Sequence, residues 1–181
     1  MDKNYSVLRC ENDFLWLKDA GIAIPVYNVD ESKIPLLLSK NNKLLKLFAN
    51  DVGLLCYHLL STGIQEKILA HEKDINFGGI FENVAAQELL CHGFDYNALF
   101  YFSSKKQGEV DFLITYQDEV LPIEIKSGKD YKEHSALNNL LSKKEYDIHQ
   151  ALVFGNCNVE IRGEKTYLPI YMIDFLRQVT I

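Results

Sequence analysis

A chain of 181 residues with 48% hydrophobic and 12% aromatic content is long enough to bury a core, as one large domain or as a domain with an appendage. Its formal net charge of −6 argues against a protein whose whole surface coats nucleic acid, because non-specific affinity for nucleic acids comes mainly from Lys and Arg. No apolar run is long enough to span a bilayer, and residues 1–11 lack the apolar segment of a signal peptide, so we expect a cytoplasmic protein.

Residues 1–75 are predicted to form a small winged-helix-like or adaptor segment. Periodicity and turn residues predict a helix over residues 12–20, strands over 22–29, 35–38 and 44–48 with a turn at 40–43, and a helix that Asp51 caps and that runs to Leu60. Because this segment begins abruptly, we expect Met1 to mark a truncated chain or an artificial start. Residues 60–79 are polar and end in Gly78-Gly79, which predicts a connection.

Residues 76–181 are predicted to form the main domain. Its expected elements are a helix over residues 80–91 with Gly93 as its C-cap, strands over 98–103, 109–116 and 120–126, a helix over 131–146, and strands over 151–154 and 166–173. The turn at residues 117–119 makes a hairpin of the second and third strands. Helices that fall between strands predict an α/β or α+β fold, with a mixed sheet flanked by helices.

The predicted hairpin carries three charged side chains that alternate with apolar ones. Asp111 follows Val110 on one strand, and Glu124 and Lys126 share one parity on the next. Two carboxylates on adjacent strands are hard oxygen ligands of the kind Mg²⁺ prefers, and a lysine beside them can stabilise charge on a phosphate. A solvent-facing hairpin shows the same alternation. The nearby helix that carries Glu82 favours the functional interpretation.

Three stretches together resemble a known pattern: Gly-Gly-Ile-Phe-Glu-Asn on the helix, Gly-Glu-Val-Asp-Phe at residues 108–112, and Pro-Ile-Glu-Ile-Lys-Ser-Gly at residues 122–128. They resemble the PD-(D/E)XK nuclease superfamily. From about Leu8 onward, the chain is also similar to the uncharacterised C-terminal region of a prokaryotic family of AAA-type ATPases. The similar stretches there include Asn-Asp-Val-Gly-Leu-Leu at residues 50–55 and Phe-Glu-Asn-x-x-x-Gln-Glu-Leu at residues 81–89.

This resemblance implies a restriction-endonuclease-like core with the order αβββαβ. It also implies a site in which Glu82, Asp111 and Glu124 bind Mg²⁺ or Mn²⁺, and in which Lys126 completes the catalytic set. An ATPase module is implied as a partner, but this chain has no Gly-x-x-x-x-Gly-Lys-Ser/Thr sequence and is not expected to hydrolyse ATP. Glu88 falls on the apolar face of the same helix, so it either replaces or joins Glu82 or is a buried, paired structural acid.

Other side chains give weaker signals. The five histidines have no metal-type spacing and the four cysteines form no Cys-x-x-Cys pair, so we assign the histidines no role and expect reduced, mostly buried thiols. Tyr96 and the aromatic residues 100–102 are more typical of a core strand than of base stacking. The following lysines form either a local basic patch or a scattered set: Lys105, Lys106, Lys126, Lys129, Lys132, Lys143 and Lys144.

Three functions fit these observations. The first is a Mg²⁺-dependent nuclease-like domain that acts on DNA phosphodiesters. The second is a catalytically silent regulatory or nucleic-acid-binding domain of an ATPase that has kept the carboxylates. The third is a protein-interaction module, which the acidic net charge favours.

Overall fold

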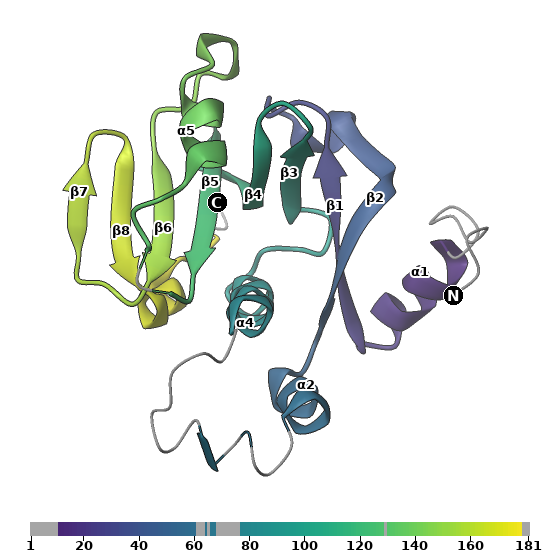
Figure 1. Ribbon diagram of the computed structural model, residues 1–181. Helices are drawn as coiled ribbons and strands as arrows, with labels where there is room; N and C mark the ends of the chain where they lie inside the picture. Colours follow the sequence, from purple (N-terminus) through teal and green to yellow (C-terminus); the bar gives the residue numbers. More distant parts are fainter. Residues whose placement is uncertain (1–10, 61–63, 65, 68–76, 129, 179–181) are drawn as a thin grey trace.

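Figure 1 shows the computed structural model of the chain, which describes residues 11–60, 64, 66–67, 77–128 and 130–178. Its centre is a mixed sheet of eight strands, with helices packed against it. The helices are α1 (Glu11–Asp19), α2 (Val52–Leu59), α4 (Gly78–Cys91) and α5 (Ser135–Leu141), with short 3-10 helices η2 (Leu36–Ser39), η3 (Lys144–Tyr146) and η4 (Ile170–Phe175). The strands are β1 (Ala23–Val29), β2 (Lys40–Ala49), β3 (Phe100–Ser104), β4 (Gly108–Tyr116), β5 (Glu119–Lys126), β6 (Ala151–Gly155), β7 (Glu160–Arg162) and β8 (Lys165–Pro169).

The strands are ordered β2-β1-β3-β4-β5-β6-β8-β7, from the blue edge to the yellow edge of the sheet in Figure 1. β3, β4 and β5 form an antiparallel meander, and β6 joins β5 in parallel. The run α4, β3, β4, β5, α5, β6 therefore has the predicted order αβββαβ. The predicted fold class, a mixed sheet flanked by helices, is confirmed.

The sheet extends beyond this core on both sides. β1 pairs in parallel with β3 and antiparallel with β2, while β8 pairs in parallel with β6 and antiparallel with β7. Strands from the predicted N-terminal segment thus belong to the same sheet as strands from the predicted main domain. The division of the chain at residue 75 stays a prediction, but it is not a division of the sheet.

Most predicted elements are confirmed, and four are wrong in part or whole. Residues 36–39 form a 3-10 helix rather than a strand, since Leu36 alone of the three leucines is buried there. The expected turn at residues 40–43 is the start of β2, which absorbs the extra residues in a bulge opposite β1. The predicted helix over 131–146 is reduced to α5 and η3. β8 ends at Pro169, which has no N–H to donate to a ladder, and η4 follows.

The structure differs from two further expectations drawn from the sequence. Gly78 and Gly79, expected in a connection, are the first residues of α4, and the rest of that connection lies largely outside the described residues. Thiol burial is lower than expected: Cys91 is exposed, and Cys56 and Cys157 are half-buried. No described helix is long and apolar enough to cross a membrane.

Two apolar clusters cover opposite faces of the sheet. The first packs α4 against the sheet through Ala85 and Leu89, with Phe112 and Ile123 among the strand residues beneath them. The second packs α5 against the other face through Leu137 and Leu140. These residues are almost completely buried, so the two helices are held firmly against the strands between them.

Side-chain amides on α4 connect that helix to the end of β2. Asn83, which is 2% exposed, accepts a hydrogen bond of 2.7 Å from the Ala49 N–H and donates one of 2.8 Å to the Ala49 carbonyl. One turn further along, Gln87 accepts a hydrogen bond of 3.0 Å from the N–H of Val52. Asn83 therefore satisfies backbone groups at the end of an edge strand and Gln87 one at the start of α2, and both hold α4 beside these segments.

Candidate metal centre

Strand β4 carries one extra residue beside Asp111. In the β3–β4 ladder Phe102 pairs with Val110 and Phe100 pairs with Leu113, so two residues of β4 face one residue of β3. The alternation of side chains is broken there, because Val110 and the residue two positions after it pack on opposite faces of the sheet. A bulge of this kind re-aims the side chain that it contains. The simple alternation predicted for Asp111 is therefore wrong in detail.

The carboxylate of Asp111 reaches the next strand, where the predicted Glu124 and Lys126 lie. Its Oδ2 accepts a hydrogen bond of 2.8 Å from the backbone N–H of Ile125. The neighbouring Glu124 is buried, at 6% exposure, and its Oε1 lies 2.8 Å from the Nζ of Lys126. The hairpin thus brings Asp111, Glu124 and Lys126 to one end of strands β4 and β5.

Glu82 joins this end of the sheet through a lysine that the sequence did not single out. The ammonium of Lys46, on β2, lies 3.2 Å from Glu82 Oε2, 3.7 Å from Asp111 Oδ1 and 2.7 Å from Glu109 Oε1. The Lys46 side chain is 19% exposed and that of Asp111 is 13% exposed, so this ion pair is largely shielded from bulk water, whereas Glu109 is 46% exposed. An isolated lysine among exposed strand residues carries no sequence signal, and only the pairing of β2 with β1 brings it here.

Burial and neighbouring charges shift the pKa of Asp111 strongly. Burial of the carboxyl, followed by the charges of Glu124 and Glu82, raises its pKa from 3.8 to about 7. The hydrogen bond from Ile125 and the charge of Lys46 oppose this rise without cancelling it. The raised pKa shows that this pocket disfavours a negative charge on Asp111.

The pKa of Glu124 is raised as well, first because the side chain is buried and then, less strongly, by the charge of Glu82. Its ion pair with Lys126 and the charge of Lys46 act in the opposite direction. For Lys46, burial lowers the pKa, but the hydrogen bond with Glu109 and the charges of the carboxylates outweigh burial and raise it. Lys46 is accordingly a permanent cation within a set of acids.

The donor set fits a divalent cation in its chemistry. Glu82, Asp111 and Glu124 offer carboxylate oxygens, the ligands that Mg²⁺ and Mn²⁺ prefer. The Oε2 of Glu124 is buried without a hydrogen-bond partner among the described residues, which a native carboxylate rarely tolerates. The three carboxylates interact electrostatically, but their oxygens are not gathered within 4.8 Å of one another in this structure. The ammonium of Lys46 forms ion pairs with Glu82 and Asp111 instead.

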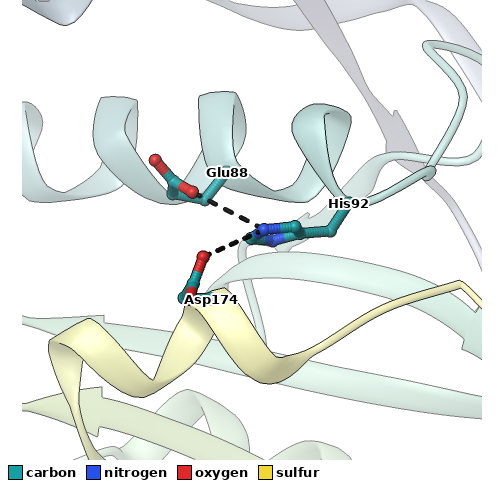
Figure 2. A group of neighbouring side chains, drawn as sticks. All are labelled: Glu88, His92 and Asp174. Atoms are coloured by element: carbon teal, nitrogen blue, oxygen red, sulfur yellow. Dashed lines mark ion pairs between the residues drawn. The ribbon is translucent and has the colours of Figure 1, made fainter.

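A second group of potential ligands lies further along α4. His92 Nε2 is 3.1 Å from Asp174 Oδ1 and 4.0 Å from Glu88 Oε2. Figure 2 shows both carboxylates directed toward the imidazole of His92. Within the described ranges, this is the only set of three such side chains whose ligand atoms all lie within 4.8 Å of one another. It fastens η4 to the end of α4. Of the alternatives for Glu88, the structure supports a paired acid, but its side chain is 31% exposed, so the expected burial is wrong. His92 gains a partner that the sequence did not predict.

An open cavity of about 670 Å³ adjoins the carboxylate cluster. Lys46 and Glu82 line it, together with Asn83 and apolar residues of β2 and α2. The aromatic residues 100–102 of β3 are 2% to 6% exposed and belong to the core, so they do not form a base-stacking surface. Among the lysines of the predicted basic patch, Lys132 and Lys143 pair with Glu160 and Glu145. These pairs reduce the positive charge that the lysines present.

The fold and the cluster define an α+β protein with a carboxylate and lysine site at the end of a central β-hairpin. Residues 77–173 match the family model described as a domain of unknown function, DUF4143, and the chain belongs to this family. The match includes Glu82, Asp111, Glu124 and Lys126, whereas Lys46 lies before it. Comparison with curated proteins and with solved structures gives no match.

Proposed function

We propose that this chain is a divalent-metal-dependent, nuclease-like domain of the PD-(D/E)XK type that acts on DNA phosphodiesters. The single observation that carries the proposal is the buried Oε2 of Glu124, which has no hydrogen-bond partner within the described ranges and which interacts electrostatically with Asp111 and Glu82. A cation is the natural partner for such an oxygen, because leaving it bare costs the desolvation energy of a charged group. The order αβββαβ and the resemblance of residues 108–112 and 122–128 to the superfamily support the same function.

Each residue of the site has a distinct part in this proposal. Glu82, Asp111 and Glu124 would hold Mg²⁺ or Mn²⁺, which supplies Lewis-acid chemistry at the phosphate when bound. Lys126 keeps Glu124 in place through its 2.8 Å ion pair, and its 28% exposed side chain leaves the ammonium accessible to a phosphate oxygen. The backbone N–H of Ile125 orients Asp111 by hydrogen bonding Oδ2, so Oδ1 is the oxygen directed to the cation site.

A second candidate is a catalytically silent regulatory or binding domain that acts with an ATPase module. The resemblance of the chain to the C-terminal regions of ATPases supports such a partner. The specific observation in its favour is Lys46, whose ammonium already neutralises Glu82 and Asp111. Carboxylates that are paired with a lysine of the same chain can be kept for structure without any need for catalysis.

Nicking of supercoiled plasmid and of branched DNA, with Mg²⁺ or Mn²⁺, separates these functions. The nuclease proposal expects cleavage by wild type, its loss in Asp111→Ala and Lys126→Met, and its retention in Asp118→Asn, which changes an exposed residue of the same hairpin. Lys126→Met is also expected to keep metal binding, because it removes no proposed ligand. If wild type leaves every substrate intact, and DNA binding survives Asp111→Ala, the silent domain is the correct function.

A further inference from the structure

Lys46 contacts the same carboxylates that the proposed cation would use. Its ammonium pairs with Oε2 of Glu82 at 3.2 Å and with Oδ1 of Asp111 at 3.7 Å. The other oxygen of Asp111, Oδ2, accepts the hydrogen bond from the backbone N–H of Ile125. The ammonium therefore faces two of the three proposed ligands through the oxygens that remain available.

A lysine ammonium and a divalent cation cannot occupy this position together. Mg²⁺ binds carboxylate oxygens at about 2.1 Å, well inside the distances that the ammonium keeps from the same oxygens. The two cations also repel each other over a few ångströms in a shielded pocket. Binding of one therefore requires withdrawal of the other.

We propose that Lys46 is a built-in counter-cation that occupies the metal position and lowers the affinity of the site for divalent cations. This inference rests on the proposed metal site and adds a residue that controls the affinity of that site. In the absence of metal, the ammonium stabilises Glu82 and Asp111. When a divalent cation binds, the ammonium of Lys46 leaves Glu82 and Asp111 and keeps its third partner, Glu109.

Glu109 provides that third partner outside the proposed ligand set. Its Oε1 is the closest carboxylate oxygen to the Lys46 ammonium, at 2.7 Å, and the side chain is 46% exposed. Lys46 also lines the cavity of about 670 Å³ beside the cluster, so its flexible stem has open space to move into. The ammonium can thus leave Glu82 and Asp111 without becoming an unpaired buried charge.

The inference gives the N-terminal strands a role at the site. Lys46 lies on β2, outside residues 77–173 that match the family. The hydrogen bonds of Asn83 to Ala49 hold that strand beside α4 and so keep the ammonium next to Glu82. Any movement of β2 relative to α4 changes the distance between Lys46 and the carboxylates, and with it the affinity for the divalent cation.

Calorimetric titration of Mg²⁺ and Mn²⁺ into the metal-free full chain tests the inference. Lys46→Met is expected to bind at least tenfold more tightly than wild type, which corresponds to about 1.4 kcal/mol. The matched control is Lys43→Met, an exposed lysine on the same strand, and its affinity should equal that of wild type. Circular dichroism and urea unfolding of each variant in EDTA establish that the compared proteins are folded.

A measurement on wild type covers the case in which Lys46→Met does not fold. With 13C-labelled lysine, the Lys46 side-chain resonance, assigned through Lys46→Arg, should shift as Mg²⁺ saturates the protein, and the Lys43 resonance should not. Wild-type binding without this shift, or equal or weaker binding by Lys46→Met, overturns the competition but leaves the metal site in place. Absence of binding by both proteins removes the metal site and the competition together.

Discussion

Asp111→Asn is expected to stabilise the protein at pH 8, although it removes a proposed ligand. The substitution keeps the shape of the side chain and an oxygen that accepts the hydrogen bond from the Ile125 N–H. It also removes a carboxylate whose ionisation in the folded state is opposed by burial and by the charges of Glu124 and Glu82. The wild-type protein carries this cost, and the variant does not.

The magnitude follows from the pKa. A rise from 3.8 to about 7 costs roughly 4 kcal/mol at about 1.36 kcal/mol per pH unit, as an upper bound. This net shift already includes the opposing effects of Lys46 and of the Ile125 hydrogen bond, so we expect a gain of at most about 4 kcal/mol. Between pH 4 and 7 the unfolded chain releases the Asp111 proton while the folded protein keeps it. The contribution of Asp111 to the stability of wild type therefore falls as the pH rises through this range, and the advantage of Asp111→Asn grows until about pH 7.

Urea unfolding in EDTA at pH 4, 5, 6, 7 and 8 measures this difference. The matched control is Asp118→Asn, an exposed position in the hairpin turn with φ of 63°, a conformation that Asn tolerates well. Its profile should run parallel to that of wild type. The reasoning is refuted if Asp111→Asn is less stable than wild type at pH 8, or if its advantage does not depend on pH.

Three other substitutions probe the framework around the site. Asn83→Ala should destabilise the protein by about 2 to 3 kcal/mol in urea unfolding, because it leaves two backbone groups of Ala49 without partners. Gly108→Ala should lower the free energy of unfolding by about 1 to 3 kcal/mol, because φ is +90° and the added Cβ would lie 2.9 Å from a side chain of α5. The control Gly128→Ala adds a Cβ that meets nothing within 4 Å, so it should change thermal stability little. Burial, and less strongly the charges of nearby lysines, lower the pKa of His134 to about 4. The contribution of His134 to stability is therefore lost as the pH falls from about 6.5 to 4, and His134→Gln should remove this contribution from the pH profile of urea unfolding.

The hairpin of β4 and β5 was predictable because its signals are local. Apolar and charged residues alternate along it, and the turn at residues 117–118 has positive φ at both positions, as a tight hairpin requires. Glu124 and Lys126 are two residues apart on one strand, so their proximity follows from strand geometry alone. The amphipathic helix over residues 80–91 was predictable in the same way.

Errors arose where neighbours distant in the sequence decided the structure. Residues 36–39 contain three leucines in a row, which favours a strand, but only Leu36 has a place in the core and the segment forms a 3-10 helix. The bulge beside Asp111 depends on how β3 pairs with β4. No periodicity within β4 reports on that pairing, so simple alternation was the expected pattern.

The sequence by itself determined the central order αβββαβ and the placing of Asp111, Glu124 and Lys126 at one end of a hairpin, because each depends on residues close together in the chain. The tertiary structure alone decided that β1 and β2 extend the same sheet and that Lys46 enters the carboxylate cluster. Both depend on contacts between segments far apart in the chain, such as the hydrogen bonds between Asn83 and Ala49. The residue type at a single position does not indicate such contacts. For that reason Lys46, the cation beside the proposed ligands, had no signal in the sequence.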